Sequence, residues 1–319
     1  MPSQRDIKRR KLSVESTKQI TRTMEMVATA KIRHATERIA AATPYSEAMV
    51  KTLSAVAAHS IGVEHPLLEE HEDKKAAIAI VVVSDRGLAG GFNSNVFRMV
   101  DKYRAENNAA GIKTNVIVCG KKGASYFHYR RLEPLMVFRD MSADPTIQEA
   151  REISSYVRSS FLDKAVDEVK VFYNHARNAA DQDLREEVIL PVQPDALKTK
   201  EGEDGNATLA AGTSFEPSSE EVLDRLLPAY VETVVYHALI DSAAAEQGAR
   251  RKAMKSATDN ATEMIETLDR LYNRVRQGAI TTEITEIVGG TQGSAAETPQ
   301  PRRPIPTRTV RFLADGRRA

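Results

Sequence analysis

The sequence predicts an α/β protein in which a long antiparallel coiled coil of N- and C-terminal helices is combined with a parallel-sheet domain. Apolar residues at helical spacing run along both ends of the chain, whereas β-rich runs alternate with helix-like segments in the middle. With 319 residues, 41% of them hydrophobic, the chain can bury a sizeable core. We expect an N-terminal coiled-coil helix at 1–60, an α/β domain at 75–215, a C-terminal coiled-coil helix at 218–288 and a disordered basic tail at 289–319.

The first helix is predicted from a stretch that lacks glycine. From Ser3 to about Ser60 there is one proline, Pro44, which predicts a possible kink where Thr43 precedes it. The apolar stripe follows steps of three and four through Ile32, Ala35, Ile39, Ala42, Ser46, Met49, Leu53 and Val56. Upstream, Ile20, Met24 and Ala28 step by four, which predicts a local slip of the heptad phase.

The last helix is predicted from a longer and more regular seam. Its members are Val222, Leu226, Ala229, Thr233, Tyr236, Ile240, Ala243, Gln247, Arg250, Met254, Ala257, Ala261, Met264, Leu268, Leu271, Val275 and Gly278. A helix over Glu220 to Val288 would measure on the order of 100 Å at 1.5 Å per residue. A lone helix of that length could not hide its stripe, so we expect the two terminal helices to pair.

The middle of the chain has the rhythm of a parallel sheet. The predicted strands are Ala76 to Val83, Asn115 to Cys119, Val169 to Tyr173 and Val188 to Val192. Helix-like segments, among them Val96 to Asn107 and Ile147 to Leu162, lie between them. Residues 195–220 are polar and rich in helix breakers, and they read as a loop.

The turn after the first strand, "SDRGLAGGFN" at 84–93, poses the question of a nucleotide site. A P-loop requires a lysine and a hydroxyl after its last glycine, but Phe92 and Asn93 follow Gly91, and the glycine spacing does not fit the dinucleotide fingerprint. We therefore expect a tight strand-to-helix turn capped by Asn93 or Ser94. For Asp85 and Arg86 an ion pair that braces the turn is favoured over a role as ligands.

No catalytic centre, metal site or cofactor is predicted. The spacing of His59, His65 and His71 suits neither one helix face nor a zinc knuckle, and Cys119 is expected to be a small buried residue. The longest apolar run, at 76–83, is far short of the roughly 20 residues of a spanning helix, and no apolar stretch follows the basic start, so we expect neither a membrane span nor a secretory signal.

Three segments, in this order, closely resemble the gamma subunit of the F-type ATP synthase: "SVESTKQITRTMEMVATAKIRHA", the turn quoted above, and "EQGARRKAMKSATDNATEMIETLDRLYNRVRQGAITTEITEIVGG". The resemblance covers the chain from about Ile7 to Gly289. It implies a central stalk whose coiled coil stands inside a ring of α and β subunits, while a Rossmann-like domain sits on a proton-driven ring of c subunits beside the epsilon subunit. ATP chemistry would belong to the β subunits, and the complex would lie on the cytoplasmic face of a bacterial plasma membrane.

The resemblance also assigns partner contacts. An acidic loop of β would push on the first helix around Met24. The positions implied to contact the catch loops of β are Arg250, Arg276, Gln277, Thr281 and Glu283. Phe215 and Glu216 match the foot that meets the rotor ring and epsilon, with a loop that anchors its aromatic residue on the sheet as the alternative.

Local charge supports an acidic partner for the first helix, because residues 1–40 carry ten basic and four acidic side chains. Two other classes stay open: a coiled-coil scaffold or nucleic-acid-binding protein, which fits the basic helix, and a nucleotide-binding enzyme with a coiled-coil arm. Family members usually end near the residue that matches Gly289. The basic extension beyond it, which contains four prolines, reads either as a regulatory brake on ATP hydrolysis or as a tolerated appendage.

Overall fold

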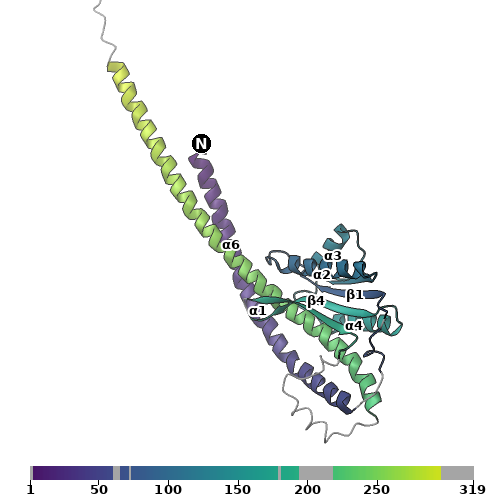
Figure 1. The fold of residues 1–319 in the computed structure, drawn as a ribbon. Coiled ribbons are helices and arrows are strands. Elements are labelled where there is room, and N and C mark those ends of the chain that lie inside the picture. Colours follow the sequence, from purple (N-terminus) through teal and green to yellow (C-terminus); the bar gives the residue numbers. More distant parts are fainter. Residues whose placement is uncertain (1–2, 60–64, 72, 179–180, 194–217, 296–319) are drawn as a thin grey trace, which may run out of the picture. The chain divides into compact units, whose positions relative to one another are not determined.

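The computed structural model describes residues 3–59, 65–71, 73–178, 181–193 and 218–295. The chain divides into two units, Val14–Glu263 and the described parts of Met1–Ser13 with Met264–Ala319. The elements are α1 (Gln4–His59), β1 (Ala76–Val82), α2 (Phe92–Ala109), β2 (Lys113–Cys119), α3 (Lys121–Tyr129), β3 (Met136–Phe138), α4 (Ile147–Leu162), β4 (Glu168–Ala176), β5 (Gln182–Leu190) and α6 (Ser219–Ala295) (Figure 1). None of the helices in the described ranges has the length and apolar content that crossing a membrane requires.

The sheet has the strand order β3-β2-β1-β4-β5, and β1 pairs in parallel with both β2 and β4. β5 is antiparallel to β4, which corrects the expectation of a wholly parallel sheet. Only residues 177–181 connect these two strands, and a parallel crossover needs a dozen residues or more. The apolar-run criterion also missed the first half of β5, because this edge strand exposes polar residues such as Glu186 to solvent.

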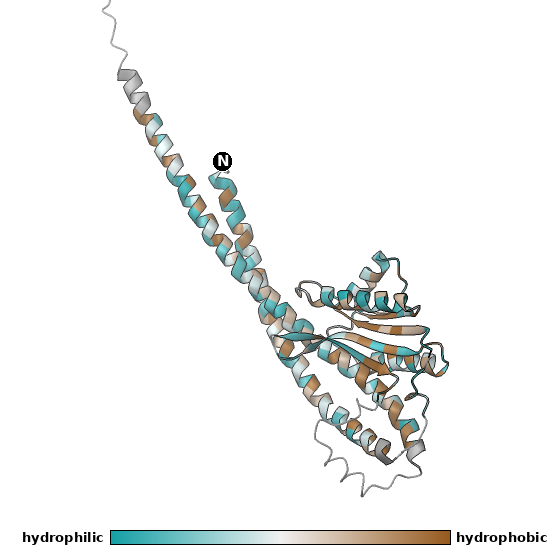
Figure 2. Cartoon of the chain, in the orientation of Figure 1, coloured by the Kyte–Doolittle hydropathy of each residue, from teal (hydrophilic) through white to brown (hydrophobic). Residues whose placement is uncertain are grey.

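Both faces of the sheet are buried. Alternate residues of β1, such as Ile78 and Ile80, join a core with α4 and with parts of α1 and α6, while Ala79 and Val81 join a core with α2 and α3. β1 accordingly carries only apolar residues, whereas polar and apolar residues alternate along α1 and α6 (Figure 2). The fold class predicted from the sequence is confirmed, with α3 and the short β3 as elements that the sequence reading did not find.

Both long helices continue through their prolines. α1 includes Pro44 and α6 includes Pro228, a residue that the sequence reading passed over. Proline removes one hydrogen bond and crowds the preceding turn, but packing of the remaining apolar face can compensate for this cost. α6 also extends past Val288 to Ala295, since the Gly289–Gly290 pair lowers helix propensity without blocking helical geometry.

The seam of α1 differs from the predicted one near its start. Ile20 is 57% exposed, and its neighbour Thr21 is buried. One continuous series of buried or partly buried positions runs along α1: Ile7, Lys11, Val14, Lys18, Thr21, Glu25, Ala28, Ile32, Ala35, Ile39, Ala42, Ser46, Met49, Leu53 and Val56, while other partly buried residues such as Met24 flank it. These positions alternate steps of four and three throughout, so the heptad phase does not slip. The predicted stripe departs from them because polar residues such as Thr21 fill seam positions near the start of the helix. On α6 the predicted seam residue Met264 is likewise 53% exposed.

Candidate functional site

The turn after β1 packs against α6. Ala89 and Phe92 form a small buried cluster with Ala245 and Ala249 of α6. Gly90 adopts φ +59°, and a Cβ added there would lie 3.8 Å from the Cβ of Ala253. Open α/β sheets bind ligands beyond the carboxyl ends of their strands, where the strand order reverses. Because β1 lies at this reversal, between β2 and β4, α6 occupies the place where such folds hold a nucleotide.

The details of the turn differ from the prediction. α2 begins at Phe92 with Gly91 as N-cap and no side-chain cap, and Asn93 instead bonds Ser84, accepting from its backbone N–H at 2.9 Å. Gly120, at the start of α3, faces this segment so closely that a Cβ would lie 2.1 Å from the Val83 carbonyl oxygen. The geometry of this turn and of Gly120 therefore allows neighbouring segments of the chain to pack closely.

Asp85 joins three loops at the carboxyl edge of the sheet. Its carboxylate accepts hydrogen bonds from the backbone N–H groups of Lys121 at 2.7 Å, Asp140 at 3.0 Å and Ser142 at 2.8 Å. Burial acts to raise the pKa of Asp85, but these bonds outweigh it and hold the pKa below its ordinary value. The favoured ion pair with Arg86 does not occur among the described residues; backbone donors compensate the charge.

The adjacent part of α6, residues 241–250, is buried on all sides. Within it, Arg250 pairs with Glu246 at 2.6 Å, and the two side chains are 10% and 4% exposed. The Arg250 guanidinium also donates toward the carbonyl oxygens of Gly87 at 3.3 Å and Arg86 at 3.5 Å. Burial raises the pKa of Glu246, although Arg250 and the Ser142 hydroxyl act against it. These contacts explain an arginine at a seam position.

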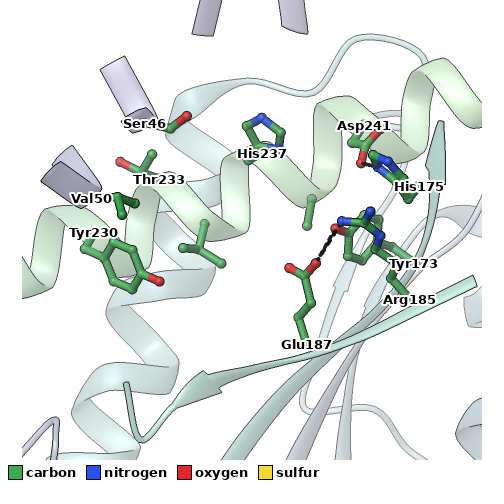
Figure 3. Close-up of a pocket in the computed structure, with 12 residues that line it drawn as sticks. Ser46, Val50, Tyr173, His175, Arg185, Glu187, Tyr230, Thr233, His237 and Asp241 are labelled. Carbon is green, nitrogen blue, oxygen red and sulfur yellow. Dashed lines mark hydrogen bonds and ion pairs between the residues drawn. The ribbon is translucent and has the colours of Figure 1, made fainter. Parts of the chain in front are cut away.

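A cavity of about 220 Å³ lies between α1, α6 and strands β4 and β5 (Figure 3). In it His175 bonds Asp241 at 2.5 Å and the Tyr173 hydroxyl donates to Glu187 at 2.9 Å. Burial, reinforced by Glu187, raises the pKa of Tyr173. Tyr173 and Glu187, and likewise His175 and Asp241, thus bond each other, and the described residues contain no cluster suited to a metal ion.

The remaining residues considered for a metal site or a reactive group contact other residues of the chain. His65 lies 3.1 Å from Asp224, and His71 bonds Asp167 at 2.8 Å and stacks on Phe161. Cys119 is buried, and burial raises the pKa of its thiol. His65 and His71 thus contact different elements instead of sharing a ligand, and the prediction of a buried cysteine is confirmed.

The residues assigned to partner contacts fall into three groups. Arg276, Gln277, Thr281 and Glu283 are exposed on α6, and Met24 is half-buried on α1. Arg250 is buried within the chain, so the structure gives it an internal role, and its contact with a β subunit stays a prediction. Phe215 and Glu216 lie outside the described residues.

Two features escaped the sequence reading. Glu246 stands four residues before Arg250, a spacing that itself indicates an ion pair on one helix face. Beyond the end of the predicted seam, α6 also exposes an apolar stripe of four residues. These are Ile280, Ile284, Ile287 and Val288, which are 46%, 56%, 62% and 52% exposed. Their helical spacing could have been found by continuing the apolar pattern past Gly278.

The basic side chains of α1 are largely exposed, as Arg9, Arg10, Arg22 and Lys31 illustrate. Lys11 pairs with Asp269 on α6 at 2.6 Å, and Arg33 pairs with Glu37 of its own helix at 2.9 Å. The Arg33–Glu37 pair is exposed and contributes little to folding stability, whereas Lys11 and Asp269 are half-buried. Most of the positive charge of the helix is therefore exposed to solvent.

Comparisons with known proteins agree with this arrangement. The family model described as ATP synthase matches residues 3–293. The ATP synthase gamma chain of Symbiobacterium thermophilum is 41% identical over 285 residues, which cover 89% of this chain and 96% of that protein.

Similar folds occur in solved structures. The central stalk and c-ring structure of Tetrahymena thermophila mitochondrial ATP synthase contains a chain with a TM-score of 0.54 and 23% identity, covering 75% of this chain and 99% of that one. A chain in the OSCP/F1/c-ring structure of the Euglena gracilis mitochondrial enzyme gives a TM-score of 0.63 at 17% identity, covering 95% of this chain and 98% of that one. The fold is therefore that of the central stalk, and, given the family match and the identity over most of its length, the chain belongs to the family of ATP synthase gamma chains.

Proposed function

We propose that the chain is the rotary central-stalk subunit of an F-type ATP synthase, which couples proton-driven rotation of a membrane ring to conformational changes in catalytic β subunits. The observation that carries the proposal is the 41% identity to a gamma chain over nearly the whole of both proteins. The chain itself is not catalytic in this proposal. The buried ion pairs and the packed turn after β1, which leave that crevice filled by α6, support it.

The partners in this proposal are the α and β subunits, the epsilon subunit and the c subunits of the ring. The apolar stripe near the end of α6 supports rotation within an apolar sleeve formed by α and β, because its four side chains are 46–62% exposed. Arg276, Gln277, Thr281 and Glu283 are exposed beside the stripe and are the proposed contacts for the β catch loops.

Met24 is the proposed contact for an acidic loop of β. It lies half-buried beside Met26 and Val27, which are 59% and 51% exposed, and Arg22 is exposed nearby. An apolar surface with a basic rim lets an acidic partner slide without a lasting ion pair. Arg250 completes the proposed β contacts, while Phe215 and Glu216 are proposed to meet epsilon and the ring.

Coupling follows from asymmetry. Two helices of unequal length present different faces to equivalent β subunits, and each face favours a different β conformation. The subunit would act as a peripheral component on the cytoplasmic face of a bacterial plasma membrane. For the extension after Gly290 we keep a regulatory brake on ATP hydrolysis as the hypothesis, with a tolerated appendage as its alternative.

Reconstitution with purified α and β subunits tests the proposal. We expect the chain to sediment with the α/β ring and to raise its multi-site ATP turnover, while the isolated chain hydrolyses no ATP. Folded chain that fails to enter the ring would contradict the proposal. Salt-sensitive binding to DNA by the isolated chain would favour the nucleic-acid-binding alternative.

A further inference from the structure

The contact between α6 and the carboxyl edge of the sheet combines two kinds of interaction. We name it the edge joint and define it by the Glu246–Arg250 pair, the carbonyl groups of Arg86 and Gly87, and the cluster of Ala89, Phe92, Ala245 and Ala249. The cluster is built largely from alanine side chains. Apolar contacts of this kind have no preferred direction and therefore resist sliding or turning of the helix only weakly.

The ion pair adds direction. The Nη2 group of Arg250 is held by the Glu246 carboxylate and donates toward two adjacent carbonyl oxygens of the turn, so these contacts favour one height and one rotation of α6 at this level. The pair is itself buried, with side-chain exposures of 10% and 4%. Because a buried ion pair contributes little net stability compared with a packed apolar pair, stability alone does not account for it.

The sheet domain must turn with the helix if the chain is a rotor. We propose that Glu246 and Arg250 are positioning residues that lock the sheet domain to α6, so that torque passes through the edge joint without slip. This inference rests on the proposed function. It gives Arg250 a role inside the rotor, in addition to the predicted contact with β.

Replacing both residues of the ion pair with methionine tests their directional bonds separately from their burial. Glu246→Met with Arg250→Met keeps the site packed with unbranched side chains of similar length but removes the directional bonds. We expect the assembled complex to pump several-fold fewer protons for each ATP that it hydrolyses, measured against an imposed pH gradient, with little change in the unfolding temperature of the chain. An unchanged pumping ratio overturns the inference.

An engineered disulfide tests the same joint by rescue. A Cβ added at Gly90 would lie 3.8 Å from the Cβ of Ala253, within the range of about 3.5–4.5 Å that disulfides use. Gly90→Cys with Ala253→Cys is introduced into the methionine-pair background; because φ is +59° at position 90, the new side chain strains the turn equally in the oxidised and reduced forms. The reduced form of the same protein is the matched control, and buried Cys119 is the only native cysteine.

Oxidation should restore the pumping ratio toward that of the wild type, and reduction should lower it again. Failure of the closed disulfide to restore the ratio overturns the inference, because the loss would then come from contacts outside the joint, such as Arg250 with β. A wild-type chain that enters the ring but supports no pumping overturns the proposed function and this inference with it. Pumping by the wild type with no loss in the variants overturns the inference alone.

Discussion

The hydroxyl groups of Thr21 on α1 and Thr258 on α6 lie 2.7 Å apart across the seam between the two helices. Each hydroxyl can also donate to a carbonyl oxygen of its own helix, that of Lys18 and that of Met254. Two protons thus serve three hydrogen bonds, and at any moment one threonine bonds along its helix while the other donates across the seam. The contact between α1 and α6 at this level is therefore polar, and it pairs one particular residue of each helix.

A double-mutant cycle measures this bond. Thr21→Val and Thr258→Val each remove the cross-seam bond, and the double variant removes it only once, so the effects on the free energy of unfolding should not add. We expect a coupling energy of about 1 kcal/mol from urea denaturation. Strictly additive effects would show that the two hydroxyls do not stabilise each other.

Ile20 and Ile32 test the revised seam. Ile20 is 57% exposed and Ile32 is 8% exposed. Ile32→Ala should lower the free energy of unfolding by about 2–4 kcal/mol because it opens a cavity in the seam. Ile20→Ala should change it by less than about 0.5 kcal/mol. Equal losses of unfolding free energy in the two variants would show that Ile20 is buried in the seam, as the apolar pattern predicted.

The same comparison shows what the sequence could predict. Heptad spacing revealed both helices and most of their seams, because apolar letters mark the buried face wherever the partner is apolar. It failed at Thr21, since a hydroxyl matched by another hydroxyl is buried without an apolar signal. It failed again at β5, whose polar first half pairs with β4 at the sheet edge, and at Arg250, whose burial depends on carbonyl groups 163 and 164 residues away. Interactions between distant segments leave little trace in local pattern.

Asp85 should show a pH-dependent contribution to stability. Its pKa in the folded chain is lower than the ordinary value of 3.8, so its contribution is present above that value and is lost as the pH falls through the lower, folded-state pKa. Asp85→Asn turns an amide N–H₂ toward at least one backbone N–H and should lower the free energy of unfolding at neutral pH by about 1–3 kcal/mol.

The control is Asp140→Asn on the neighbouring loop. Asp140 is exposed and has φ +61°, a conformation that asparagine tolerates well. This variant should unfold like the wild type. Equal stability of Asp85→Asn and the wild type, measured by denaturation at neutral pH, would contradict the assigned role of the carboxylate.

The apolar stripe at the end of α6 should matter only in the complex. Ile284 is 56% exposed, so Ile284→Asp should leave the unfolding of the isolated chain almost unchanged. In an apolar sleeve the added carboxylate would be desolvated, and ATP hydrolysis by the assembled complex should fall several-fold. Glu286→Asp, two residues later and exposed, keeps a carboxylate on the same part of the helix and is the control. Full activity of Ile284→Asp would show that no apolar partner surrounds this turn.

Rotation of the chain inside an α/β ring tests the central claim most directly. Tyr129 is 84% exposed, so Tyr129→Cys offers an attachment site for an optical probe, whereas native Cys119 is buried. With the ring fixed to a surface through β, we predict unidirectional rotation of the probe that begins on addition of ATP and stops when ATP is removed. ATP hydrolysis by the same complexes with a probe that stays still or only fluctuates would contradict the account.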